Sequence, residues 1–144
     1  MTEEKHNPST LWTGNFIKII VVNFFIFFSF HMLLPTLPIF VKSIGGQDSI
    51  VGLITGLFTI SALLIRPFAG LLLDRIGRRS IFWTGLSLFI LATFSYSLFT
   101  AVTLVLLFRF IHGFGWGAAS TASTTIATAN IPRKRFGAGL AYTG

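Results

Sequence analysis

One charged stretch decides the fold: Gly70-Leu-Leu-Leu-Asp74-Arg75-Ile-Gly77-Arg78-Arg79. A long apolar run leads into it and another leads out of it, and four of its last six residues are charged. Gly70 lets another helix approach, and Gly77 is typical of a turn whose backbone conformation costs other residues more. Charged side chains at the end of a membrane segment stay in water or pair at the membrane rim. The stretch therefore predicts a short polar turn between two membrane helices.

The composition agrees with a membrane protein. Of the 144 residues, 53% are hydrophobic and 10% are charged, which is too apolar for an ordinary soluble domain. A formal net charge of +7 could suit nucleic acid. The eleven lysines and arginines instead cluster between long apolar runs, which argues for the lipid bilayer as partner and against nucleic acid. With no cysteine, disulfides and thiolate metal sites are excluded.

Four apolar stretches are long enough to cross a membrane, which takes about 20 residues. They cover about 16–40, 50–73, 80–98 and 103–129, and a fifth helix begins near 137. Residues 1–15 form a polar tail, and the run after it is too long for a signal-peptide core. We expect an all-α, multi-pass helix bundle, in which residues 16–144 form one domain.

The orientation follows from the basic residues in the short loops. If the N-terminus is cytoplasmic, the outer side carries Lys42 alone. The cytoplasmic side then carries Lys5, Lys18, Arg75, Arg78, Arg79, Arg133, Lys134 and Arg135. This asymmetry predicts a cytoplasmic N-terminus and four crossings of the cell membrane.

The second stretch has small residues and one arginine on a single helical face: Gly52, Gly56, Thr59, Leu63, Arg66 and Gly70. Small residues allow close helix contact in lipid, so we expect this face to pack against the glycines of the fourth stretch. An arginine inside a membrane segment is costly. Arg66 lies about 12 Å from Asp74 along the helix, so it either reaches the cytoplasmic surface or serves function.

The fourth stretch also has a polar face, formed by Arg109, His112, Gly113, Trp116, Ser120 and Ser123. Its second half is rich in small and hydroxyl residues, which lipid does not favour, so it should face other helices or a cavity. Arg109 lies about 9 Å inside the helix and can hold an anionic group. His112 either titrates during proton coupling or is a hydrogen-bonded packing residue.

These patterns resemble the major facilitator superfamily. The Gly-x-x-x-Asp-Arg-x-Gly-Arg-Arg run is similar to the loop between its second and third helices. Arg109 followed by Gly113, Gly115 and Gly117 is similar to its fourth helix, in which a common glutamine is His112 here. The resemblance spans residues 16–144, about a third of a twelve-helix member built from two halves. It implies a gating loop of Gly70, Asp74, Arg75, Gly77, Arg78 and Arg79, and a transport path with Arg66, Arg109, His112, Gly113 and Gly117.

The resemblance implies secondary transport of a small solute, with export of drug-like or small polar compounds in exchange for protons. No Walker loop, paired carboxylates or nucleophile elbow is present, so we expect neither an enzyme nor a cofactor. Alternating access needs two bundles, so we expect this chain to be inactive without a C-terminal half or self-association. Two alternatives stay open: a non-transporting membrane subunit, and a small four-helix transporter acting as an oligomer. The second is disfavoured because small multidrug-resistance proteins, which such a transporter would resemble, rely on a glutamate in the first helix. Residues 16–40 contain no glutamate.

Overall fold

The computed structural model describes residues 12–143, apart from the side chain of Lys134. Most of the predicted N-terminal tail, including Lys5, lies outside the described residues. The long helices are α1 (Gly14–Ser43), α2 (Asp48–Arg75), α3 (Arg78–Leu98) and α4 (Val102–Ala129). A single 3₁₀ turn, η1 (Arg133–Arg135), leads into the short helix α5 (Phe136–Ala141). Within this part of the chain there is no strand, which confirms the all-α prediction.

Helix α1 is longer than the sequence predicted. It begins two residues earlier, where the Thr13 hydroxyl accepts a hydrogen bond from the amide of Phe16. It also continues through Pro35 and Pro38 to Ser43, so neither proline ends it. Each proline removes one backbone hydrogen bond, and a helix in lipid tolerates this loss where neighbouring groups re-satisfy the backbone.

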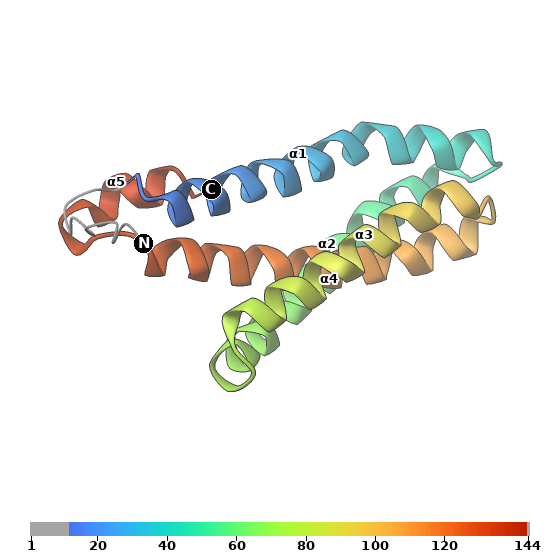
Figure 1. The fold of residues 1–144 in the computed structure, drawn as a ribbon. Coiled ribbons are helices and arrows are strands. Elements are labelled where there is room, and N and C mark those ends of the chain that lie inside the picture. Colours follow the sequence, from blue (N-terminus) through green and yellow to red (C-terminus); the bar gives the residue numbers. More distant parts are fainter. Residues whose placement is uncertain (1–11, 144) are drawn as a thin grey trace.

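Helix α4 is the centre of the bundle. In Figure 1, α1 runs beside α4, while α2 and α3 cross α4 obliquely and then diverge from it towards their shared turn. The α1–α2 and α3–α4 loops share one end of the bundle. The α2–α3 turn and the connection from α4 to α5 lie towards the other. The second half of α4 therefore has fewer helices around it than the first half.

Helices α3 and α4 touch backbone to backbone where two glycines meet. A Cβ atom at Gly85 would lie 2.6 Å from the amide nitrogen of Ala119, and one at Gly115 would lie 2.5 Å from that of Phe89. These distances leave no room for a side chain. Close approach of backbones through small residues is a main source of helix association in membranes.

The packing of α2 against α4 corrects one prediction. The glycines of α4 do face α2: a Cβ at Gly113 would lie 2.5 Å from the Phe58 carbonyl oxygen, and one at Gly117 would lie 2.8 Å from that of Ala62. The α2 glycines do not take part, since a Cβ at Gly52, Gly56 or Gly70 meets nothing within 4 Å. The predicted packing role of the α2 glycine face is therefore wrong within this chain.

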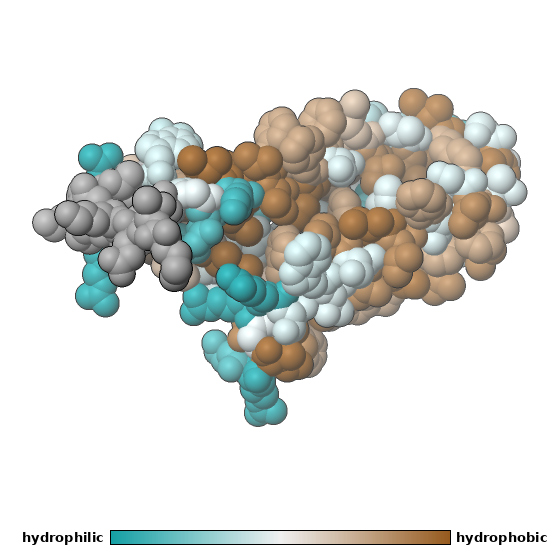
Figure 2. All heavy atoms as spheres, in the orientation of Figure 1, coloured by the Kyte–Doolittle hydropathy of each residue, from teal (hydrophilic) through white to brown (hydrophobic). Residues whose placement is uncertain are grey.

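The surface of the bundle suits lipid. All four long helices are long and apolar enough to cross a membrane. Large apolar side chains such as Phe24, Phe28 and Leu91 are more than two-fifths exposed. Figure 2 shows apolar residues over most of the face in view, with hydrophilic residues gathered near the α2–α3 turn and near α5. At the opposite end, Lys42 and Asp48 form an ion pair of 2.7 Å. The direction of insertion stays a prediction.

Candidate functional site

The predicted gating residues come together at the α2–α3 turn. Asp74 and Arg75 close α2, while Arg78 and Arg79 open α3, and all four side chains are exposed. Between the helices, Gly77 has a φ of +99°, a conformation that glycine adopts without strain. Among residues 12–143, none of these arginines forms an ion pair. The turn thus presents a carboxylate and three guanidinium groups at one end of the bundle, and Gly70 lies about one helical turn before Asp74 on α2.

A buried polar cluster joins α3 and α4. Arg109 is 1% exposed and His112 is fully buried. The Nη1 atom of Arg109 and the hydroxyl of Tyr96 each lie 3.2 Å from Nδ1 of His112. Because a guanidinium group can only donate, Nδ1 must accept. The imidazole is therefore neutral, and its proton sits on Nε2.

No carboxylate balances the charge of Arg109 within the described part of the chain. Its guanidinium carbon lies 4.4 Å from the centre of the Phe58 ring instead. An aromatic face attracts a cation more strongly where water is excluded. Two buried N–H groups of the cluster, Nε of Arg109 and Nε2 of His112, have no acceptor among the described residues. The cluster can therefore donate to an acceptor such as a carboxylate.

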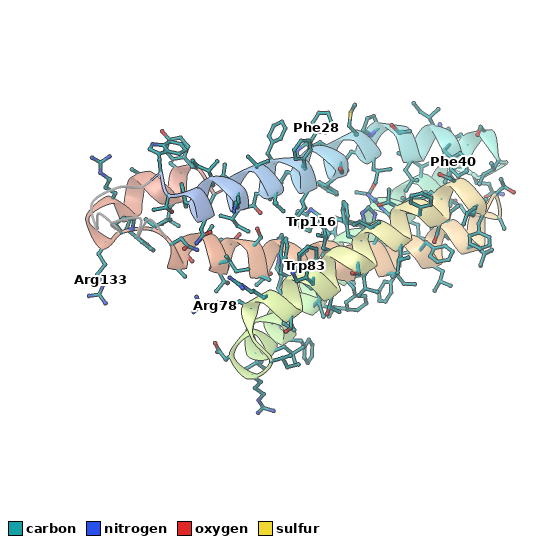
Figure 3. The ribbon with its side chains drawn as sticks, in the orientation of Figure 1. Phe28, Phe40, Arg78, Trp83, Trp116 and Arg133 are labelled. Carbon is teal, nitrogen blue, oxygen red and sulfur yellow. The ribbon has the colours of Figure 1, made fainter. Side chains whose placement is uncertain are left out.

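Trp116 links this cluster to the space between α1 and α4 (Figure 3). Its ring lies 5.7 Å from that of Phe27, 5.1 Å from that of Phe30 and 5.6 Å from that of Phe58. The guanidinium carbon of Arg66 lies 5.6 Å from the centre of the indole. The Arg66 side chain is exposed and lies at the edge of this aromatic cluster. The sequence alone did not predict its contact with Trp116.

A groove of about 600 Å³ runs beside this aromatic cluster. No acidic residue lines it. The lining residues come from α1, α2, α4 and the C-terminal segment: Phe27, Arg66, Trp116, Ser120, Thr121, Thr124, Thr125, Leu140 and Thr143. Several of the hydroxyls bond to the carbonyls of their own helix, as Thr121 does to that of Gly117 at 2.7 Å, which lets polar residues sit in a membrane helix.

The structure separates the predicted path residues into two groups. Arg66 lines the groove. Arg109 and His112 lie in the interior between α2, α3 and α4, while Gly113 and Gly117 form the α2–α4 contact. A path through the second group stays a prediction.

A second polar contact joins α1 and α4, and it was not predicted from the sequence. Asn23 is 5% exposed, and its side-chain oxygen accepts a hydrogen bond from the buried hydroxyl of Ser123. Its amide nitrogen lies 3.5 Å from the carbonyl oxygen of Thr143. The signal was an asparagine inside a phenylalanine-rich run, because a polar group in lipid needs a partner. The contact ties α1 to α4 at the end of the groove.

Comparison with known proteins supports a transport role. A family model described as Major Facilitator Superfamily matches residues 19–144. The quinolone resistance protein NorA of Staphylococcus aureus is 30% identical over 118 residues, which cover 79% of this chain and 30% of that protein. Multidrug resistance protein 2 of Bacillus subtilis is 32% identical over 96 residues, which cover 66% of this chain and 24% of that protein. The chain thus spans less than a third of the length of these relatives.

Proposed function

Because this chain belongs to the major facilitator superfamily, we propose that it carries the cytoplasmic gate and one wall of the substrate path of a drug exporter. The names of two relatives, a quinolone resistance protein and a multidrug resistance protein, support export of drug-like aromatic compounds. Transporters of this family work by moving two helix bundles around a site near the middle of the membrane. The energy would come from an ion gradient, with protons as the coupling ion.

The groove beside Trp116 carries this proposal. Its volume of about 600 Å³ lies within the range of pockets that hold drug-sized molecules, roughly 300–1,000 Å³. Trp116 and Phe27 offer aromatic surfaces, on which a flat ring can stack. Arg66 and the hydroxyls of α4 offer hydrogen-bond donors to polar substituents of the substrate. An aromatic wall with a few polar groups is typical of sites that accept many related compounds.

The gate in this proposal is the α2–α3 turn. Among the described side chains these exposed charges form no ion pair, and in this proposal they pair with a second helix bundle. Asp74 lies in the last turn of α2, where the helix dipole disfavours a negative charge, so a cationic partner or the N-terminus of an opposing helix would stabilise it. The positive φ of Gly77 allows the sharp turn that brings the four charges together.

The Arg109–His112 pair would couple transport to protons. The hydrogen bond between them requires an unprotonated Nδ1 on His112. A proton arriving at Nδ1 would end that bond and place two cations side by side. The guanidinium group would then move away from the imidazole, towards any carboxylate within reach. Proton binding would thereby change the packing between α2, α3 and α4.

Efflux from whole cells tests the proposal. Cells of an exporter-deficient strain would express the whole gene of this chain, and the efflux of ethidium and norfloxacin would be followed by fluorescence. We expect efflux that stops when a protonophore collapses the proton gradient. Asp74→Asn and Arg109→Ala should each abolish it while protein levels are retained.

Matched controls are Asp48→Asn and Arg133→Ala, which alter an exposed acid and an exposed arginine away from both sites. Both should keep normal efflux. Normal efflux by Asp74→Asn and Arg109→Ala would refute the assigned roles. No efflux above empty-vector cells would favour a non-transporting membrane subunit.

A further inference from the structure

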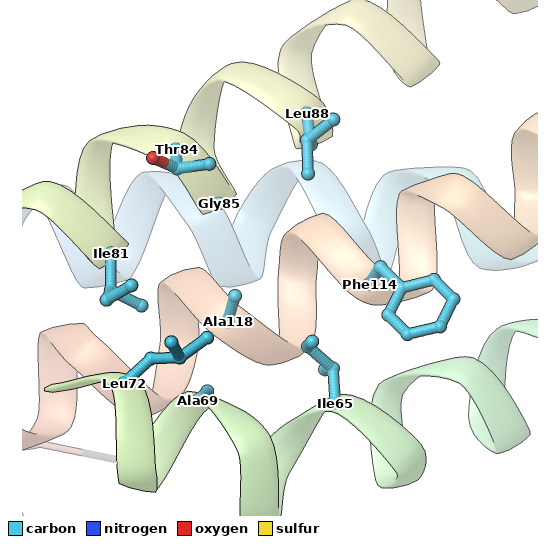
Figure 4. A pocket seen from close by; sticks show the side chains of 9 residues that line it. All are labelled: Ile65, Ala69, Leu72, Ile81, Thr84, Gly85, Leu88, Phe114 and Ala118. Carbon is cyan, nitrogen blue, oxygen red and sulfur yellow. The ribbon is translucent and has the colours of Figure 1, made fainter. Parts of the chain in front are cut away.

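A second hollow lies on the other side of α4, between α2 and α3 (Figure 4). This crevice has a volume of about 200 Å³. It is lined by Ile65, Ala69, Leu72, Ile81, Thr84, Gly85, Leu88, Phe114 and Ala118. Ala69, Gly85 and Ala118 are among the lining residues, and their small or absent side chains leave the space between α2 and α3 unfilled.

The walls of the crevice are apolar. Thr84 is the one lining residue with a polar side chain, and its hydroxyl donates to the Ser80 carbonyl at 2.9 Å. Thr84 is exposed and Leu88 is 36% exposed, so the crevice opens on the outer surface of the described bundle. Apolar cavities of about 150 Å³ already hold a benzene molecule, so this crevice has room for a segment of hydrocarbon chain.

Arginines stand at the end of the crevice nearest the α2–α3 turn, which is the predicted cytoplasmic end. Arg75 follows the lining residue Leu72 by three positions, and Arg78 precedes the lining residue Ile81 by three. Residues three apart are neighbours on one helix face, so each arginine lies about one turn beyond the crevice wall. Both side chains are exposed, and neither forms an ion pair among the described residues. Arg79 adds a third exposed charge, and the turn keeps an excess of positive charge despite Asp74.

We propose that this crevice binds one anionic phospholipid of the surrounding membrane. One acyl chain lies in the crevice, and the phosphate group lies against Arg75 and Arg78. The apolar walls select a hydrocarbon chain over a soluble anion, and the arginines select an anionic headgroup over a zwitterionic one. Basic groups between membrane helices on the cytoplasmic side are suited to anionic headgroups. This inference concerns a lipid site on the outer surface, and it does not depend on the substrate. Arg75 and Arg78 belong to the proposed gate as well, so a lipid bound there would compete with a second helix bundle for the same charges.

Spin-labelled lipids test the headgroup part of the proposal. The purified chain would be placed in phosphatidylcholine nanodiscs with trace spin-labelled phosphatidylglycerol or phosphatidylcholine, and electron paramagnetic resonance would report the immobilised fraction. We expect phosphatidylglycerol to be immobilised preferentially. The preference should fall about fivefold for each arginine changed, in Arg75→Gln and Arg78→Gln. Arg133→Gln, at an exposed arginine of η1, is the matched control and should keep the preference.

A second pair of variants tests the crevice itself. Thr84→Trp fills the crevice from its open side, and Leu91→Trp adds the same ring two turns along α3, at an exposed position outside the crevice. We expect less immobilised lipid for Thr84→Trp alone. Three results would overturn the proposal. They are equal immobilisation of the two lipids by the unaltered chain, an equal loss of preference in Arg133→Gln, and equal immobilisation by the two tryptophan variants.

Discussion

Replacing Arg109 with methionine tests how this buried charge is balanced. The guanidinium group is 1% exposed, lies over the Phe58 ring at 4.4 Å and donates to His112 at 3.2 Å. Methionine matches the length of the aliphatic part of the arginine side chain up to Nε and carries no charge. After the substitution, Nδ1 of His112 keeps the hydroxyl of Tyr96 as a donor, so no buried acceptor loses its last partner.

The expected change in the free energy of unfolding follows from one unfavourable and two favourable contributions of Arg109. An arginine at the centre of a membrane helix costs about 2.5–3.5 kcal/mol, and this is an upper value for Arg109, which lies in the first half of α4. Contact with a desolvated ring offsets roughly 2 kcal/mol. A hydrogen bond from a charged donor offsets about 1.5 kcal/mol more. Because these contributions nearly cancel, Arg109→Met should change the free energy of unfolding by less than about 1 kcal/mol, whereas breaking a buried ion pair costs about 3–5 kcal/mol.

The assay is reversible unfolding of the purified chain in mixed micelles, followed by circular dichroism as the denaturing detergent is raised. Arg109→Lys is the informative companion, because lysine keeps the charge but lacks the planar group that lies over Phe58. It should be less stable than the methionine variant by about 1–2 kcal/mol. A loss of 3 kcal/mol or more in Arg109→Met would show that the charge has a strong partner, and the reasoning would fail.

Two further predictions concern packing and topology. Gly85→Ala should lower the free energy of unfolding by about 1–3 kcal/mol, because its Cβ would meet the Ala119 nitrogen at 2.6 Å. Gly56→Ala, where a Cβ meets nothing within 4 Å, should be neutral or stabilising by up to about 1 kcal/mol in the same assay, and equal losses in both variants would contradict the packing. Single cysteines at Gln47, just before α2, and at Arg78, just after it, should react with an impermeant thiol reagent from opposite sides of the membrane, with Gln47 labelled from outside. Labelling of Arg78 alone from outside would reverse the orientation, and labelling of both from outside would contradict the crossing.

The sequence predicted the helices well because membrane helices are set by length and hydropathy. Apolar runs of 20 or more residues have no other stable conformation in lipid, and the charged stretch from Asp74 to Arg79 marks where one helix must end. The same sequence could not tell which face of α2 meets α4. In lipid, the packed face and the exposed face of a helix are both apolar, so hydropathy does not tell them apart. The sequence therefore could not show that Ser61, Ala62 and Ala69 are buried while the glycines of α2 pack against no other part of the described chain.

The sequence predicted some residues of the candidate site but not their partners. Arg109 and His112 were identified because charged and titratable groups are rare in membrane helices. Their partners were not identified, because Tyr96 and Phe58 are ordinary residues of such helices and lie far from them in sequence. The contact between Arg66 and Trp116 joins two helices whose rotation relative to each other is set by packing, and packing is not visible in a hydropathy pattern.

Phe58 is the residue through which the buried cluster and the groove can influence each other. Its ring lies under the guanidinium group of Arg109, 5.5 Å from the ring of His112 and 5.6 Å from that of Trp116. Trp116 in turn lies under Arg66 and lines the groove. The interior of a helix bundle is close-packed. If the guanidinium group of Arg109 moved away from the imidazole of His112, it would therefore displace the Phe58 ring beneath it. Displacement of Phe58 would then shift Trp116, the aromatic surface on which we propose that the substrate stacks. Under that proposal, a proton at His112 and a ligand in the groove act on the same side chain from its two sides.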